Sequence, residues 1–88
     1  MRAIAKGRVQ GVCFRLYVQE QAEQLGLCGW VRNCPDGSVE AVAEGEPETL
    51  AEFEKRLRHG SPWSRVDGLT RKDSASTGEF DGFAIRHG

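Results

Sequence analysis

The chain lacks several features that would place it in other classes of protein. No apolar run approaches the roughly 20 residues that a membrane-spanning helix needs. Its first residues lack the apolar stretch of a secretion signal and lead directly into a predicted strand. The formal net charge of −1 gives no electrostatic reason to expect binding to nucleic acid or to an anionic membrane. We therefore expect a soluble cytoplasmic protein.

Cysteine is scarce, and its three positions do not fit a disulfide framework. Three cysteines cannot all pair within one chain, and no export signal points to an oxidising compartment. Cys28 and Cys34 flank a predicted strand that would hold them roughly 20 Å apart, whereas a disulfide needs Cα atoms within about 7 Å. A cysteine-dependent phosphatase needs an arginine six positions after its nucleophile, and none of the three cysteines has one. We expect reduced thiols without a catalytic role, Cys13 included.

Metal and nucleotide sites are also missing from the sequence. His59 and His87 show no ligand spacing with each other or with the cysteines, so we expect both to be solvated and expect no metal. The glycine-rich stretch near the N-terminus lacks the Gly-Lys-Ser/Thr ending of a nucleotide-binding loop. We therefore expect no cofactor.

The pattern of apolar residues predicts one small α+β domain over residues 1–88. Two helices are expected, the first with a buried face of Phe14, Val18, Ala22 and Leu25, and the second, starting near Pro47, with one of Leu50, Phe53 and Leu57. The expected strands are Ile4–Val9, Leu27–Asn33, Val39–Glu44, Trp63–Arg71 and a last short strand that contains Phe83 and Ile85. The order β-α-β-β-α-β predicts a ferredoxin-like sandwich, with two helices on one face of an antiparallel sheet.

The charges of the second predicted helix serve its own stability. Glutamates crowd its start and basic residues crowd its end, as the helix dipole favours. Glu52 with Arg56 and Glu54 with Arg58 are spaced for contact along the helix. We assign these charges no functional role.

The stretch Gly7–Arg15 has the features of an anion site. Its sequence, Gly-Arg-Val-Gln-Gly-Val-Cys-Phe-Arg, predicts a strand end, a glycine turn and the start of a helix with Arg15 in its first turn. Unpaired backbone N–H groups and the positive end of the helix dipole converge at such a place. The guanidinium of Arg15 adds a planar set of donors that matches phosphate oxygens. Taken alone, this stretch is equally compatible with an ordinary turn before a helix.

A second stretch, Gly29–Val39, reads Gly-Trp-Val-Arg-Asn-Cys-Pro-Asp-Gly-Ser-Val. Together the two stretches resemble the acylphosphatase family, whose signatures run G-x-V-Q-G-V-x-F-R and G-W-V-x-N-x-x-D-G-x-V. The resemblance continues through nearly the whole chain. It includes Gly45, Gly60-Ser61-Pro62, Val66-Asp67 and Phe83-Ala84-Ile85-Arg86.

The resemblance implies the hydrolysis of an acyl phosphate to a carboxylate and inorganic phosphate, without a metal or cofactor. Arg15 and the loop amides are implied to hold the phosphate, and Asn33 to position the attacking water. The amides concerned belong to Gln10, Gly11, Val12, Cys13, Phe14 and Arg15. Inorganic phosphate is then both a product and a competitive ligand. The sequence does not fix whether the end of the strand that carries Asn33 lies beside the loop.

Two other functions stay open from the sequence. Acylphosphatase-like domains occur at the start of larger hydrogenase-maturation proteins, so the chain could be a non-catalytic module that binds an acyl or carbamoyl phosphate. A ferredoxin-like RNA binder would stack bases on aromatic residues of its central strands. The predicted strand Val39–Glu44 has no aromatic residue and carries two glutamates, which counts against RNA. We expect a monomer that acts on a small molecule.

Three residues beside the signatures invite a role at the site and also have a plainer interpretation. Arg8 could add positive potential near the loop or simply be solvated. Trp30 could pack against the sheet or line the acyl side of the site. Arg32 is expected to point away from Asn33, since successive side chains of a strand alternate, and so to lie at the surface.

Overall fold

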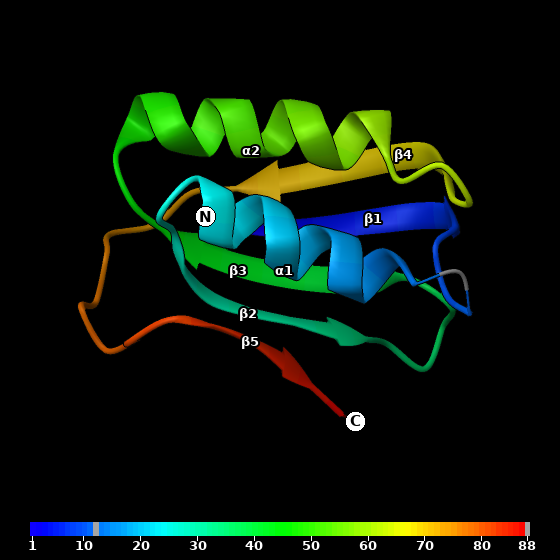
Figure 1. Cartoon of the computed structure of the whole chain (residues 1–88), viewed down its shortest axis with the longest axis horizontal. Coiled ribbons are helices and arrows are strands. Elements are labelled where there is room, and N and C mark those ends of the chain that lie inside the picture. The colour runs from blue at the N-terminus through cyan, green and yellow to red at the C-terminus, as the bar shows by residue number, and fades with distance from the viewer. Residues whose placement is uncertain (12, 88) are drawn as a thin grey trace.

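The computed structural model describes residues 1–11 and 13–87, which fold into a five-stranded sheet with two helices against one face (Figure 1). In chain order the elements are β1 (Arg2–Arg8), α1 (Phe14–Gln24), β2 (Cys28–Asn33), β3 (Val39–Glu44), α2 (Pro47–His59), β4 (Arg65–Lys72) and β5 (Phe83–Arg86). Among the helices of these residues, none is long and apolar enough to cross a membrane.

The strands lie in the order β4-β1-β3-β2-β5. The first four pair antiparallel, as predicted, which confirms the ferredoxin-like α+β fold. The fifth strand differs, because β5 pairs parallel with β2, and the sheet is therefore mixed. The chain leaves β4 at the end of the sheet where β2 begins and crosses to the far edge there, so β5 can only run alongside β2 in the same direction.

The crossing segment between β4 and β5 is an exposed loop, as predicted for Lys72–Glu79, apart from Lys72, which still belongs to β4. Glu44, at the end of β3, anchors it by accepting hydrogen bonds from the Thr77 amide at 2.8 Å and the Gly78 amide at 3.1 Å. The bond from the Thr77 amide is the main reason why the pKa of the Glu44 carboxyl lies below its usual value.

The core lies between the helices and the sheet. The helix-facing side of the sheet presents mostly small residues, and this allows the two helices to pack closely on it. The buried apolar side chains of the strands are Ala3, Ala5, Val31, Val39, Ala41, Ala43 and Phe83. The helices contribute Phe14, Val18 and Ala22 from α1, with Leu50, Phe53 and Leu57 from α2. The predicted helix faces are thus confirmed, except that Leu25 is the half-buried C-cap of α1.

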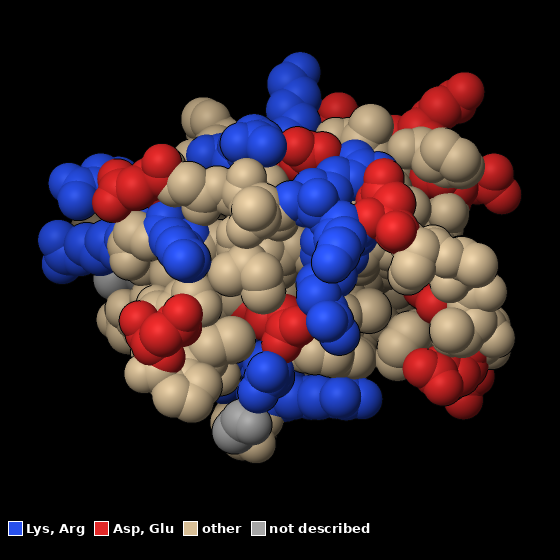
Figure 2. Space-filling view, turned by 180° about the vertical axis from the view of Figure 1, so that it is seen from behind, with Lys and Arg blue, Asp and Glu red and all other residues tan. Residues whose placement is uncertain are grey.

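The opposite face of the sheet is uncovered and charged, and Figure 2 shows a band of Lys and Arg across it. The Glu40 side chain, which is 8% exposed, lies between Arg2 at 3.0 Å and Arg32 at 2.7 Å. The Arg86 guanidinium lies over the Trp30 ring, 4.4 Å from its centroid. Arg32 is therefore a surface residue, as predicted, and of the two interpretations of Trp30 the structure supports packing on the sheet.

Two strands begin two residues away from the predicted position, and the other strand boundaries that differ are off by a single residue. β1 begins at Arg2 rather than Ile4, because it pairs along its whole length with β4. β4 begins at Arg65 rather than Trp63, because a tight turn precedes it. In that turn the Ser61 amide donates to Ser64 Oγ at 2.7 Å and the Ser64 amide donates to the Ser61 carbonyl at 3.1 Å. Trp63 lies at this turn and is 75% exposed.

Gly29 allows β2 to approach β3 closely, and replacing it should destabilise the fold. Its φ is +146°, and an added Cβ would collide with the carbonyl oxygen of Val42. We expect Gly29→Ala to lower the free energy of unfolding by at least about 2 kcal/mol in urea titrations. Gly68→Ala in β4 is the matched control, because its Cβ would meet no atom within 4 Å, and it should change stability by less than about 0.5 kcal/mol. Equal unfolding midpoints for the two variants would contradict this account.

Candidate active site

One end of the sheet gathers both signature stretches. β1 runs toward this end, α1 starts there, and β2 and β5 finish there, at the right of Figure 1. A pocket of about 470 Å³ opens between them, which we call the Asn33 pocket. Its lining residues are Val9, Gly11, Cys13, Phe14, Arg15, Leu16, Asn33, Ile85 and His87. No carboxylate is among these residues, so the pocket suits an anion.

The start of α1 provides backbone donors to this pocket. Cys13 is the N-cap and adopts a left-handed conformation with φ 59°, and Gly11 has φ +73°. Within the described chain, no side chain caps this helix end, and its first turn contains no acidic residue. The first N–H groups of a helix have no partner inside the helix, and the helix dipole places partial positive charge there. An anion in the pocket can satisfy both.

Arg15 of α1 and Asn33 of β2 line the same pocket. Arg15, in the first turn of α1, is half-buried, and its Nη1 donates to the Arg86 carbonyl of β5 at 3.3 Å. Asn33 is the last residue of β2, and its Oδ1 is buried without a hydrogen-bond partner among the described residues. A buried acceptor of this kind costs free energy unless a water or ligand satisfies it. The end of β2 that carries Asn33 therefore does lie beside the loop.

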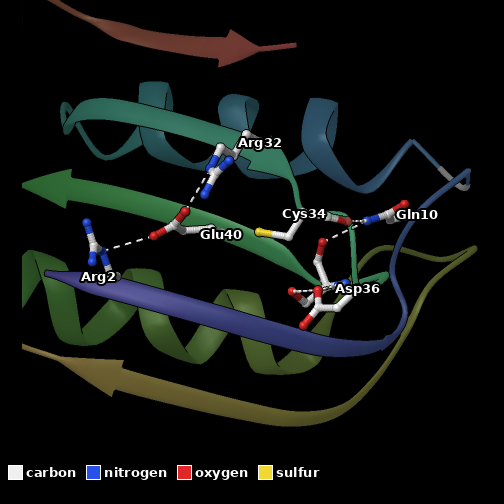
Figure 3. A network of polar contacts seen from close by, with 7 residues as sticks. Arg2, Gln10, Arg32, Cys34, Asp36 and Glu40 are labelled. Carbon is white, nitrogen blue, oxygen red and sulfur yellow. Dashed lines mark hydrogen bonds and ion pairs between the residues drawn. The ribbon is translucent and has the colours of Figure 1, made fainter. Parts of the chain in front are cut away.

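The side chain of Gln10 connects the loop to the β2–β3 hairpin (Figure 3). Its Nε2 donates to the Cys34 carbonyl and to the Ser38 carbonyl, both at 2.8 Å. These two carbonyls also close the hairpin turn, since the Cys34 amide donates to Ser38 and the Gly37 amide donates to Cys34. Both amide protons of Gln10 are thus used to fix the loop relative to the residue that follows Asn33.

The hairpin turn is further stabilised by Asp36. Its Oδ1 accepts from the Ser38 hydroxyl at 2.6 Å and from the Ser38 amide at 3.0 Å (Figure 3). Both hydrogen bonds lower the pKa of the Asp36 carboxyl below its usual value, and the bond from the Ser38 hydroxyl has the larger effect. The turn that orients the end of β2 therefore has its own local hydrogen bonds.

Most of the site residues expected from the sequence lie at this pocket. Gly11, Cys13, Phe14, Arg15 and Asn33 line it directly, and Val12 lies outside the described residues. All three cysteines are free, Cys13 exposed and the other two half-buried. Among the described residues, no three His, Cys, Asp or Glu side chains come together as metal ligands.

Sequence reasoning missed the outer wall of the pocket. Leu16, Ile85 and His87 also line it, although His87 was expected to be only a solvated terminal residue. Leu16 belongs to the first turn of α1, beside Arg15. The place of Ile85 and His87 follows from the parallel pairing of β5 with β2, which no local pattern predicts. For Gln10, the sequence indicated only a role for the backbone amide, whereas the Gln10 side chain makes the hydrogen bonds to the hairpin.

Comparison with known proteins identifies the family of this fold and site. The family model for acylphosphatase matches residues 1–85. The chain belongs to the acylphosphatase family. An acylphosphatase of Methylococcus capsulatus is 47% identical over 85 residues, which are 97% of this chain and 92% of that protein. A solved acylphosphatase from Bacillus subtilis superposes with a TM-score of 0.93 and 42% identity, over 97% of this chain and 94% of that one.

The predicted resemblance to acylphosphatases and the prediction of an enzyme are thereby confirmed, since relatives at 45 to 50% identity carry the name of this enzyme. A second kind of neighbour is much longer. The solved HypF of T. kodakarensis matches with a TM-score of 0.83 and 30% identity, over 97% of this chain but only 11% of that one.

The bonds made by Gln10 predict how the hairpin responds to its loss. Gln10→Leu leaves two partly buried carbonyls without their side-chain donors, which costs about 1–3 kcal/mol. We expect the Cys34 and Gly37 amides to exchange with solvent at least about tenfold faster, because the turn opens more easily. Gln19→Leu is the matched control, since Gln19 bonds the Phe83 carbonyl at 3.1 Å, away from the turn. Unchanged exchange in Gln10→Leu would show that the bonds do not hold the hairpin.

Proposed function

We propose that this acylphosphatase-family enzyme hydrolyses the carboxyl-phosphate bond of small acyl phosphates without a metal ion. The phosphate is held by Arg15 and by the loop amides of residues 10–15, and Asn33 positions the attacking water. The observation that supports this proposal most strongly is that, among the described residues, the Asn33 pocket joins a helix start without a side-chain cap, a guanidinium and a buried amide oxygen without a hydrogen-bond partner.

The phosphate and the water have distinct places in this pocket. The dianionic phosphate lies against the start of α1, where Arg15 supplies two parallel donors and the backbone supplies the rest. The unpartnered Oδ1 of Asn33 accepts a hydrogen bond from water and so turns an oxygen lone pair toward phosphorus. Positioning and charge stabilisation are the main requirements of phosphoryl transfer through a loose transition state.

The reaction needs no general acid from the protein. The water oxygen forms a bond to phosphorus, the bond from phosphorus to the acyl oxygen breaks, and the carboxylate leaves with the electron pair. A carboxylate has a pKa of about 4, so it leaves without being protonated. The proton of the water passes to an oxygen of the phosphate itself. Arg15 and the loop amides stabilise the negative charge on the phosphoryl oxygens throughout.

A second candidate function is a binding module that retains an acyl or carbamoyl phosphate without hydrolysing it. The likeness to 11% of the HypF chain favours it, because there the same fold is one part of a longer protein. The unpartnered Asn33 Oδ1 argues for hydrolysis, since holding a phosphate alone does not require a water acceptor there.

Beyond the site itself, we propose that the protein is a cytoplasmic monomer whose residues 1–88 act as one domain. Its partners are then a small acyl phosphate and inorganic phosphate, which is a product and a competitive ligand. The apolar composition of the core and the charged open face of the sheet are compatible with this state.

Removing the amide of Asn33 should separate turnover from phosphate binding. We expect Asn33→Ala to lower kcat for acetyl phosphate at least about 100-fold, because the water loses its orientation. The inhibition constant of inorganic phosphate should change by less than about threefold, since Arg15 and the loop remain. Arg32→Ala is the control from the neighbouring position, because Arg32 lies on the other face in an ion pair with Glu40. Normal turnover in Asn33→Ala would disprove the water-positioning role.

The variant Arg15→Lys keeps the positive charge and removes the planar guanidinium, so it tests whether the geometry of the Arg15 donors matters. We expect Arg15→Lys to weaken inhibition by inorganic phosphate about tenfold or more and to lower kcat/KM for acetyl phosphate about 100-fold, because an ammonium cannot supply two parallel donors. Both quantities come from steady-state kinetics with phosphate as inhibitor. Wild-type constants in Arg15→Lys would mean that Arg15 contributes only a positive charge.

A further inference from the structure

Two hydrogen bonds from α1 hold β5 beside the Asn33 pocket. Arg15 and Gln19 lie four positions apart in α1, and therefore on the same face of the helix. Gln19 Nε2 donates to the Phe83 carbonyl at 3.1 Å, and Arg15 Nη1 donates to the Arg86 carbonyl at 3.3 Å. The first and last residues of β5 are thus both bonded to α1, and the residue that follows Arg86 lies close to the Arg15 guanidinium.

That residue is His87, and its side chain lines the pocket. Ile85 and His87 both belong to the lining, whereas the Arg86 guanidinium between them lies over the Trp30 ring, on the uncovered face of the sheet. This alternation is the one expected of an extended chain. His87 is exposed, so its imidazole is accessible to an anion that enters the pocket from solvent.

The described lining of the pocket carries few charges, and His87 adds one that depends on pH. Arg15 is its only arginine or lysine, and it contains no carboxylate. A phosphate with two negative charges is therefore not neutralised by Arg15 alone. Of the groups that share the pocket with His87, Cys13 is the other one that titrates, and Asn33 is uncharged. Histidine is the side chain that ordinarily gains and loses its charge between about pH 5 and 8.

We propose that His87, in its protonated form, is a second cationic ligand of the substrate phosphate beside Arg15. A bound dianion favours the protonated imidazole, and by linkage the protonated imidazole tightens the binding of the dianion by the same factor. The extra affinity is present at low pH and is lost as the pH rises and the imidazole becomes neutral. This inference rests on the proposed function, because it assumes that the phosphate lies between Arg15 and the start of α1.

Inhibition by sulfate at two pH values tests this proposal. Sulfate stays a dianion over the range used, whereas inorganic phosphate itself changes its protonation. With acetyl phosphate as substrate and constant ionic strength, we expect the inhibition constant of sulfate to be about fivefold lower near pH 5.5 than near pH 7.5. The effect is no larger because salt screens an exposed charge. In His87→Gln the two constants should differ by less than about 1.5-fold, since the glutamine amide stays neutral.

Two variants serve as controls for other titrating groups. His59→Gln removes the other histidine, which ends α2 and does not line the Asn33 pocket. Cys13→Ser removes the other titrating side chain of the pocket and keeps the backbone amide. Both variants should retain the fivefold dependence on pH. Retention of the dependence in His87→Gln, or its loss in either control, would overturn the assignment to His87.

A measurement on the wild-type protein is independent of any effect of a substitution on folding. At about pH 6.5, where histidine is ordinarily half protonated, sulfate should move the His87 ring signal in the NMR spectrum toward its position in acidic solution. The His59 signal should stay in place. A His87 signal that does not respond to sulfate would overturn this inference and leave the proposed function intact. Inhibition by sulfate that is equally strong in Arg15→Lys would instead overturn the proposed function, and this inference with it.

Discussion

The connection between the loop of residues 10–15 and the β2–β3 hairpin is the constraint on which the proposed site depends. The two segments are joined through the side chain of Gln10, whose bonds to Cys34 and Ser38 span 24 and 28 positions in the sequence. The hairpin in turn is held to the core by the pairing of β3 with β1 and β2, and Gly29 lets β2 and β3 approach closely. If Asn33 positions the attacking water as we propose, a small displacement between the loop and Asn33 would misalign that water, and such errors cost orders of magnitude in rate.

The ion pairs of the described residues lie outside the Asn33 pocket. On α2 the pairs Glu52–Arg56 and Glu54–Arg58 form as their spacing predicts, each at 3.0 Å, and exposed pairs of this kind contribute at most about 1 kcal/mol. On the uncovered face Glu40 is shared by two arginines (Figure 3). By contrast, the start of α1 faces a pocket whose described lining contains Arg15 and no carboxylate, and we propose that a chain with a net charge of −1 holds a phosphate there.

The parts of the fold with a local cause could be predicted from the sequence, and the parts set by long-range pairing could not. The helix faces follow from apolar spacing, and the start of α1 with Arg15 in its first turn follows from the glycine turn before it. The parallel edge strand β5 could not be predicted, because its direction depends on where the loop after β4 crosses the sheet. For the same reason, the sequence could not show that His87, which follows β5, lines the Asn33 pocket. The predicted strand also began too early, at Trp63, because the Ser61–Ser64 bonds make that segment a turn.

The central claim is that the water held at Asn33 attacks phosphorus while the loop and Arg15 hold the phosphate. Hydrolysis of acetyl phosphate by the wild-type enzyme in oxygen-18-labelled water tests this claim most directly, with the products separated and analysed by mass spectrometry. The account predicts that each turnover places one labelled oxygen in inorganic phosphate and none in acetate. Label in the acetate would mean that water attacks the carbonyl carbon, and would contradict the roles given to Asn33 and to the pocket around it.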